Sequence, residues 1–379
     1  DGPFLHWIQA KAVVLATGGG GHLFANTTNP TQAAGEGIAL AWRAGAIIED
    51  LEFVQFHPTA LKLDGAPSFL LSEALRGEGA VLVDCLGESP VAHLKGLDLA
   101  PRDEVSRALV QSMRGAGSHY IGLDLKPIPQ SIIQSHFPTI LQRCREFGLD
   151  PLKDLIPVAP AAHYWMGGVA TNLNSLTSVS NLYAVGEVAC TGLHGANRLA
   201  SNSLMECLVF ARKMKSISLS SEPFRLQNRN LKNASSTPLC LNLDNGLTDQ
   251  TLLKDIQRMR GICWKHAGVD RSAQGIKNAR RKIRRFYSKV SNQPLIDFMD
   301  QQPYDKVNYL EESSRRNLNL LLDLRSRQIT TSLLFEACLF RQESRGGHFR
   351  HDFPSSMPYW RCHSQQKIGE LIGTRKVRR

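Results

Sequence analysis

Hydrophobic residues along this chain follow two periods, one typical of buried strands and one typical of helices. Residues 12–17 form an unbroken apolar run that ends at four glycines, 18–21. Such a run predicts a strand covered on both faces, as in a parallel sheet. Residues 31–46 carry helical periodicity instead. The positions available for one buried side of this helix are Ile38, Leu40, Ala41 and Ala44.

Beyond residue 52 the pattern changes to short apolar runs separated by Gly and Pro, as at 69–71, 80–83 and 121–123. This predicts a mixed α/β insertion that continues to about residue 160. A short buried strand at 181–187 then resumes the first sheet. An insertion between two strands of a doubly wound sheet leaves a cleft at the domain boundary, a usual place for a small-molecule site.

The C-terminal part of the chain predicts helices after a polar connection. Residues 216–245 are rich in Ser, Asn and Pro, and three segments with helical periodicity follow, 252–266, 274–290 and 314–340. The expected fold class is α/β: a partial doubly wound sheet with an inserted α+β capping domain and a C-terminal helical bundle. The expected domains are 1–50 and 165–216 for the two parts of the doubly wound domain, 51–164 for the capping domain, 217–245 for a linker and 246–379 for the helical domain.

Composition places the chain among ordinary globular proteins. It has 379 residues, of which 42% are hydrophobic and 21% charged, and no apolar run approaches the ~18–20 residues that span a bilayer. No basic and then apolar leader opens the chain. The eight cysteines form no C-x-x-C pair and no metal-ligand spacing, so we expect reduced thiols, a cytoplasmic location, no membrane and no metal site. Cysteines in apolar surroundings, expected in the core, are Cys85, Cys207 and Cys338.

The net charge of +11 is concentrated in two segments, 280–285 and 375–379. A nucleic-acid surface is one interpretation of such clusters. No interleaved aromatic residues or nucleic-acid motif support it, so no nucleic-acid partner is expected. The simpler interpretation is a solvated helix face whose charge helps to attract an anionic substrate.

The segment 193–204, LHGANRLASNSL, is the most informative for function. It joins an imidazole, a guanidinium and a glycine to the start of an apolar run, 204–210. This combination predicts an anion pocket at a helix N-terminus, where free N–H groups and the helix dipole favour negative charge. The preceding strand ends in Gly186-Glu187, an arrangement that holds a nucleotide-type cofactor at the edge of a parallel sheet.

Six motif blocks occur in an order that resembles the succinate dehydrogenase/fumarate reductase flavoprotein family. The resemblance covers residues 11–366 and implies non-covalent FAD as the cofactor. The blocks are ATGGGG at 16–21, FVQFHPT at 53–59, SEALRGEG at 72–79, PRD at 101–103, His163 with Gly167-Gly168 leading to HGANR at 194–198, and ESRGGHFR at 343–350 with Asp352.

A four-carbon dicarboxylate requires two separate anion clamps, for which arginine and imidazole are suitable donors. The resemblance implies that His57 and Ser72 bind one carboxylate, with Gln55 nearby, and that His163 and Arg198 bind the other. Many family members have Thr in place of Ser72, and the hydroxyl group is retained.

The resemblance also implies that Arg102 is the general acid/base, relayed through Glu73 and Arg76. Arginine carries protons poorly because its pKa in water exceeds about 12. Such a role requires neighbouring positive charge and exclusion of water, which Arg76 and Arg198 would supply. The alternative is that Arg102 only pairs with Asp103 or Glu104 at a helix start.

Flavin contacts implied by the same motifs are Glu36, Glu187, Ser203 and Leu204. Glu187 would accept hydrogen bonds from a ribityl or ribose hydroxyl, and the N–H groups of Ser203 and Leu204 would face the pyrimidine edge. The alternative for Glu187 is an ordinary exposed loop carboxylate. The alternative for Glu36 is a residue that does not contact the flavin.

The remaining histidines are expected to have other roles. His194 orients either the loop or the flavin. The tail residues Arg345, His348 and Arg350 are expected to bind the helical domain to the flavin domain. Histidines outside the motifs are predicted to be uninvolved: His22, His93, His119, His136 and His266.

The G-x-G-x-x-G phosphate fingerprint that the family carries near its N-terminus does not occur here. The chain therefore resembles the C-terminal two-thirds of a family member, and we expect a piece of a longer enzyme that would hold flavin poorly by itself.

Within the family, these blocks imply oxidation of L-aspartate to iminoaspartate with oxygen or fumarate as electron acceptor. This is the first step towards quinolinate and NAD, with quinolinate synthase as the pathway partner. Two alternatives stay open. One is a succinate dehydrogenase or fumarate reductase flavoprotein subunit, which requires an iron–sulfur partner; the other is a non-catalytic remnant.

Overall fold

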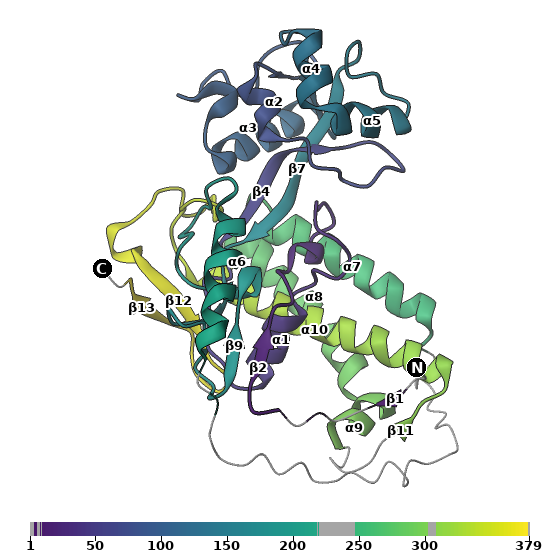
Figure 1. The fold of residues 1–379 in the computed structure, drawn as a ribbon, viewed down its shortest axis with the longest axis vertical. Coiled ribbons are helices and arrows are strands. Elements are labelled where there is room, and N and C mark those ends of the chain that lie inside the picture. Colours follow the sequence, from purple (N-terminus) through teal and green to yellow (C-terminus); the bar gives the residue numbers. More distant parts are fainter. Residues whose placement is uncertain are drawn as a thin grey trace.

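A computed structural model describes residues 4–5, 8, 10–217, 219, 247–301 and 308–377. It has two parts: a capping lobe, at the top of Figure 1, and a larger body below it. Two long paired strands, β4 (Val54–Leu61) and β7 (Ile156–Trp165), run from the body into the lobe.

The capping lobe is a four-stranded antiparallel sheet with helices packed on it, in the strand order β4-β7-β6-β5. Its core is a separate cluster of buried side chains that includes Leu61, Leu82, Leu109 and Ile156. The other elements of the lobe are α2 (Glu73–Gly77), β5 (Val81–Val83), α3 (Arg102–Ala116), β6 (Ile121–Asp124), α4 (Gln130–His136) and α5 (Pro138–Glu146).

The glycine-rich turn of the sequence lies in the body, beside a short parallel strand pair. Strand β2 (Val13–Leu15) pairs with β9 (Leu182–Ala184), which confirms that the sheet resumes in this segment. Helix α1 (Glu36–Arg43) follows the turn, and its N-cap Gly35 has φ = +77°, a conformation that favours glycine. The turn and the start of α1 thus lie at the carboxyl ends of parallel strands, where doubly wound folds bind cofactors.

A second, five-stranded sheet joins three strands from residues 48–190 to the last two described strands, in the order β10-β8-β3-β12-β13. Because β12 pairs with β3 through Gln365 and Glu49, the last described strands are built into the body instead of the helical bundle. The strands are β3 (Ile48–Glu49), β8 (Gly168–Ala170), β10 (Ala189–Cys190), β12 (Cys362–Gln366) and β13 (Gly373–Lys376). A separate antiparallel pair is formed by β1 (Phe4–Leu5) and β11 (Asn308–Tyr309).

In the described residues after 247, four α-helices pack together and confirm the helical expectation. The side chains of Thr248 and Ser272 each accept a backbone N–H at the helix starts that follow them. The longest helix buries one side along its whole length and packs on its two longest neighbours (Figure 1). These helices are α7 (Asp249–Ala267), α8 (Ala273–Ser291), α9 (Pro294–Gln301) and α10 (Glu312–Phe340). None of the helices in the described part is both long and apolar enough to cross a membrane.

Some expectations about burial are wrong. Val13 and Val14 of β2 are 50% and 42% exposed, because within the described residues β2 pairs only with β9. Leu40 and Ala44 are exposed, on the face of α1 opposite Ile38 and Ala41.

Two of the three cysteines expected in the core are also exposed, Cys85 and Cys207, whereas Cys338 is buried. Cys85 lies in the turn after β5, and Cys207 lies on the outward side of α6 (Asn202–Lys213) with Leu204 and Leu208. The predicted linker, 217–245, falls almost entirely outside the described residues.

The tail motif connects the helical bundle to the loops of the body, but through the backbone of Gly347, whereas the side-chain hydrogen bonds of Arg345, His348 and Arg350, predicted to make this link, stay within the C-terminal part of the chain. The His348 Nδ1 lies 2.7 Å from Arg271 Nη1, at the turn between α7 and α8. The Gly347 N–H donates to the Ala196 carbonyl, in the loop before Arg198, at 3.0 Å. The Arg350 guanidinium donates to the carbonyl of Leu339 at the end of α10.

A buried ion pair holds the end of α10 against the strand that leads to the site. Arg341 Nε donates to Glu52 Oε1 at 2.5 Å, and both side chains are fully buried. Ser364 on β12 donates to the other carboxylate oxygen at 2.7 Å. Removing one member of such a pair leaves the other charged and desolvated.

We therefore expect Glu52→Ala to lower the free energy of unfolding by about 3 kcal/mol, because Arg341 loses the shortest of its buried ion pairs and keeps only the longer ones with Glu343 and Asp50. Chemical denaturation of the variant and the parent measures this difference. Glu88→Ala, at an exposed turn, serves as the control and should be close to neutral. An equal, small effect of both substitutions would contradict the assigned role of the pair.

Candidate active site

One cavity of about 580 Å³ lies where the capping lobe meets the body. Its walls come from β4, the start of α2, the start of α3, β7 and the loop that leads into α6. Five of the predicted site residues that would touch substrate or its proton line this cavity: His57, Ser72, Arg102, His163 and Arg198, with Glu73 beside them. Ser203 and Leu204, two of the predicted flavin contacts, line it as well.

Arg102, Glu73 and Arg76 form a line of alternating charge. Arg102 donates from Nε and Nη2 to Glu73 Oε2 at 2.8 and 2.6 Å. On the other side of the carboxylate, Arg76 Nη2 lies 3.7 Å from Glu73 Oε1. Arg102 does not pair with Asp103, which accepts from Arg107 and Asn197 instead. Only Arg102 and Glu73 of the three reach the cavity wall, with Arg76 buried behind them.

Burial lowers the pKa of Arg76, and the charge of Arg102 lowers it further, although Glu73 and Asp98 oppose this shift. The Nε and Nη2 atoms of Arg76 have no hydrogen-bond partner. Such crowding of guanidinium groups is the condition under which arginine can exchange a proton.

Gln55 holds the two cavity arginines in position. Its Oε1 accepts from Arg102 Nη1 at 3.0 Å and from Arg198 Nη2 at 3.2 Å. Its Nε2 donates to the Asn197 side chain at 2.8 Å and to the Arg198 carbonyl at 2.7 Å. Gln55 is buried and does not line the cavity, so the structure places it behind the arginines instead of beside a ligand.

The two predicted histidines lie face to edge, with ring centroids 5.3 Å apart. His57 Nδ1 accepts the Thr59 backbone N–H at 3.3 Å, which leaves Nε2 as the protonated nitrogen. His163 Nδ1 lies 3.0 Å from the Thr28 hydroxyl. Burial and the charge of Arg102 hold the pKa of His57 well below its usual value, and burial with Arg198 and Arg102 lowers that of His163 to about 4. Both rings are therefore neutral N–H donors at pH 7.

Protonation of His163 makes stability depend on pH. Its pKa of about 4 in the folded protein lies below the unfolded value of about 6.5, so the unfolded state binds more protons between these values. Stability is therefore full above pH 6.5 and declines as the pH falls towards 4. Between pH 7.5 and 5.5, the free energy of unfolding of His163→Asn should fall by about 1 kcal/mol less than that of the parent, as measured by urea unfolding at both pH values.

The exposed His119 provides the control, because His119→Asn should leave the pH dependence of the parent unchanged. A parent-like pH dependence in His163→Asn would show that His163 titrates normally.

Arg198 reaches the cavity from the loop before α6. Its guanidinium stacks on the Tyr164 ring at 4.5 Å, donates from Nη1 to the Leu199 carbonyl, and leaves Nε buried without a hydrogen-bond partner. Burial and then Arg102 lower its pKa. A carboxylate in the cavity would satisfy the free Nε and offset this positive charge.

The start of α6 fits the electron-rich edge of a flavin ring. Ser201, the N-cap residue, has φ = +62°, and no side chain caps the helix. Of the first N–H groups of α6, that of Asn202 donates to the Leu199 carbonyl at 3.3 Å and that of Leu204 to the Ser201 carbonyl at 3.2 Å. The Ser203 N–H, also at the cavity wall, is therefore the one best placed to meet a ligand at this helix N-terminus. The residues present therefore fit the ring of FAD, whereas the fingerprint for its pyrophosphate is not in this sequence.

Glu36 and Glu187 lie outside the cavity lining, at the glycine turn. Glu187 Oε1 accepts the Trp165 N–H at 2.9 Å and occupies the space beside Gly19. Its burial raises its pKa to about 7. Glu36 is exposed in the first turn of α1. Their assignment to FAD stays a prediction.

Most of the residues that support the cavity-lining side chains without lining the cavity themselves were not predicted. Glu206 accepts from the hydroxyls of Tyr164 and Thr191 at 3.1 and 2.5 Å and lies 2.8 Å from His194 Nε2. His194 is thus held by a carboxylate and does not line the cavity. For Glu206 the sequence offered one signal, an acidic residue three positions after Ser203 on the same helix. For Thr28, which contacts His163, it offered none.

Comparison with known proteins places this geometry in one class, the FAD-binding flavoproteins. Residues 4–204 match the model of the FAD binding domain, and residues 256–370 match that of the fumarate reductase flavoprotein C-terminal domain. The chain belongs to the succinate dehydrogenase/fumarate reductase flavoprotein family. This confirms the family, the fold class and FAD as its cofactor.

Curated relatives narrow the resemblance further. The chain is 42% identical over 366 residues to an L-aspartate oxidase from Nostoc sp. and 37% identical over 360 residues to the chloroplastic L-aspartate oxidase of Oryza sativa subsp. japonica. The alignments cover 94% and 91% of this chain but 63% and 54% of those proteins. The chain thus spans less than two thirds of the length of these relatives.

Solved structures agree on the fold. The E. coli quinol fumarate reductase subunit FrdA superposes with a TM-score of 0.77 at 26% identity, covering 97% of this chain and 65% of that one. The Mycobacterium smegmatis Sdh1 structure with UQ1 superposes with a TM-score of 0.72 at 26% identity, covering 98% and 63%.

Proposed function

We propose that this chain forms the substrate side of an FAD-dependent enzyme that oxidises L-aspartate to iminoaspartate. The observation that carries the proposal is the single cavity in which two imidazoles, one hydroxyl and two guanidinium groups meet beside an uncapped helix start. The similarity to L-aspartate oxidases, at 42% identity for the Nostoc protein, supports aspartate as the dicarboxylate.

The neutral rings and the hydroxyl act as binding groups. His57 Nε2 and the Ser72 hydroxyl hold one carboxylate, and His163 with Arg198 holds the other. Ser72 Oγ already accepts the Ala74 N–H at 3.2 Å, so its own proton is free to donate to the ligand. Neutral imidazoles suit this task because a pair of imidazolium ions so close to two arginines would repel them.

The substrate must lose a hydride from its α-carbon and a proton from its amino group as the C=N bond forms. Bound FAD would supply the hydride acceptor for this reaction, with oxygen or fumarate as the final electron acceptor. Arg102 can accept this proton only after its cation has passed one to Glu73, whose carboxylate lies 2.6 Å from Nη2, so the net transfer runs from the substrate amino group through Arg102 to Glu73. Gln55 fixes the direction of the Arg102 guanidinium relative to Arg198.

The proposal includes non-covalent FAD, a cytoplasmic location and a place before quinolinate synthesis, with quinolinate synthase using the product. Glu36 and Glu187 would contact FAD at the glycine turn, and the N–H groups of Ser203 and Leu204 would face its pyrimidine edge.

The test is aspartate-dependent release of hydrogen peroxide by the protein supplied with FAD. We expect release with L-aspartate and none with succinate. Dye reduction with succinate and no reaction with aspartate would favour a succinate dehydrogenase or fumarate reductase subunit. Because this chain is expected to hold flavin poorly by itself, the assay uses the full-length protein, and failure of that protein to take up FAD would refute the enzymatic proposal and support a non-catalytic role.

A further inference from the structure

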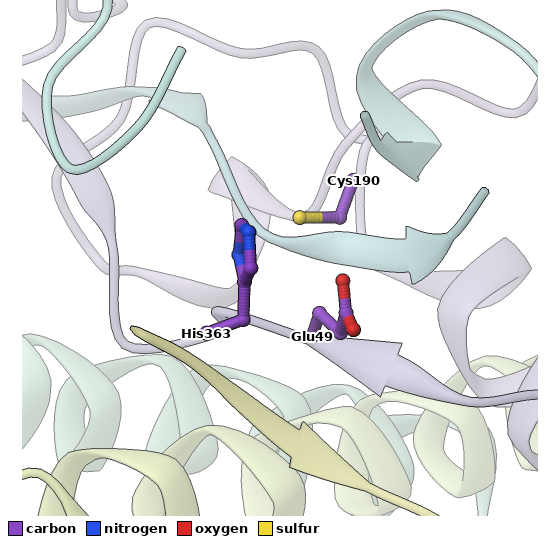
Figure 2. A group of neighbouring side chains, drawn as sticks. All are labelled: Glu49, Cys190 and His363. Atoms are coloured by element: carbon purple, nitrogen blue, oxygen red, sulfur yellow. The ribbon is translucent and has the colours of Figure 1, made fainter. Parts of the chain in front are cut away.

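A cluster of three potential metal ligands lies on the five-stranded sheet, away from the cavity (Figure 2). Glu49 comes from β3, Cys190 from β10 and His363 from β12, and all three are buried. One donor atom from each lies within 4.8 Å of the other two. The proposed mechanism uses none of these residues.

The side chains converge in the picture, with the Cys190 sulfur and the Glu49 carboxylate directed towards the space beside the His363 ring. Asp50 supplies a further donor beside two of these residues. Its Oδ2 lies 2.6 Å from His363 Nδ1 and 3.8 Å from Cys190 Sγ. The Asp50 carboxylate therefore borders the thiol and the imidazole of the cluster.

We propose that Cys190, His363 and the carboxylates of Glu49 and Asp50 form a structural Zn²⁺ site that joins β12 to the body. A thiolate and an imidazole favour Zn²⁺ over the hard cations Mg²⁺ and Ca²⁺. Four protein ligands without an open position are typical of structural zinc, which contributes directly to folding.

The required movements are small. Tetrahedral Zn²⁺ with bonds of about 2.0–2.3 Å places its ligands about 3.3–3.7 Å apart, so two donors 4.8 Å apart must approach by about 1.1–1.5 Å. The Asp50 oxygen and the imidazole nitrogen, 2.6 Å apart, must instead separate by about 0.7–1.1 Å.

Charge and outer contacts also suit a divalent cation. With Cys190 as a thiolate and His363 neutral, the two carboxylates and the thiolate carry three negative charges. Zn²⁺ and Arg375 balance these charges, so the buried cluster is neutral. Arg375 holds Glu49 at 2.6 and 2.8 Å, and Gln365 donates to it at 3.0 Å, contacts that orient a ligating carboxylate from behind.

Sequence spacing could not reveal this cluster, because its members come from strands far apart in the chain. They become neighbours only when β12 pairs with β3. The absence of closely spaced Cys and His residues therefore excluded only a metal site built from one short segment, and not one assembled from distant strands.

Cobalt(II) is a suitable probe because it replaces Zn²⁺ and reports a thiolate ligand by charge-transfer absorption. We expect metal-free protein to bind one equivalent of Co²⁺ with this absorption, and Zn²⁺ to displace it. Cys190→Ser should abolish the absorption. Cys362→Ser, one residue from His363 on the same strand, should retain it and serves as the matched control.

Thermal unfolding provides a second measurement. Zn²⁺ should raise the unfolding temperature of the parent and of Cys362→Ser, but not that of Cys190→Ser or His363→Gln. If Cys190→Ser does not fold, His363→Gln replaces it, and Co²⁺ should then bind more weakly than to the parent, so that more Co²⁺ is needed to reach the same absorption. Absence of thiolate absorption in the parent, or its persistence in Cys190→Ser, would overturn the proposal and leave a hydrogen-bonded core cluster.

Discussion

Arg102→Lys is expected to reduce aspartate oxidation about a thousandfold, within the range usual for loss of a general acid/base. Lysine cannot contact Glu73 through two nitrogens and Gln55 through a third, as the Arg102 guanidinium does. The proton acceptor would then be misplaced relative to the substrate amino group. Turnover with saturating aspartate measures the loss.

Binding should survive this substitution, because the carboxylate clamps are other residues. Quenching of flavin or protein fluorescence by succinate, an unreactive dicarboxylate under this proposal, should give a dissociation constant close to that of the parent. Arg114→Lys is the control, since Arg114 lies on the same helix with its side chain 62% exposed. Parent-like turnover in Arg102→Lys would remove Arg102 from proton transfer.

Arg198→Leu should instead raise the Michaelis constant about a hundredfold, equivalent to about 2.7 kcal/mol. Leucine leaves one substrate carboxylate without its charged partner in a site with little water. Gln55 still holds Arg102 after this change, so the maximal rate should fall much less than the apparent affinity. Steady-state kinetics over a wide range of aspartate concentrations separate the two effects.

Arg212→Leu, in the last turn of α6 and exposed, is the matched control and should leave the kinetics unchanged. An unaltered Michaelis constant in Arg198→Leu would show that the ligand carboxylate binds elsewhere. A loss of maximal rate equal to that of Arg102→Lys would assign Arg198 to the chemical step instead.

The sequence predicted which residues line the cavity better than how they are supported. The motifs named His57, Ser72, Arg102, His163 and Arg198, and the structure brings all five to the lining of one cavity. Their partners depend on tertiary contacts between distant segments. The hydroxyl of Thr28 meets His163 only because its loop packs against β7, and no local pattern encodes that contact.

Hydrophobic periodicity had the same limit. It located α7, α8 and α10 to within a few residues, because each buries one continuous side. It failed for β2, where the run of apolar residues indicated burial on both faces but Val13 and Val14 are exposed. Periodicity describes what a segment can bury, whereas the neighbours that cover it come from elsewhere.

Both histidines of the cavity lie on the antiparallel strand pair that connects the body to the lobe, His57 on β4 and His163 on β7. Side chains alternate between the two faces of a strand, so inserting or deleting one residue in either strand would turn its imidazole away from the ligand. The outer loops of the lobe can therefore change in length during evolution, whereas β4 and β7 can gain or lose residues only in pairs.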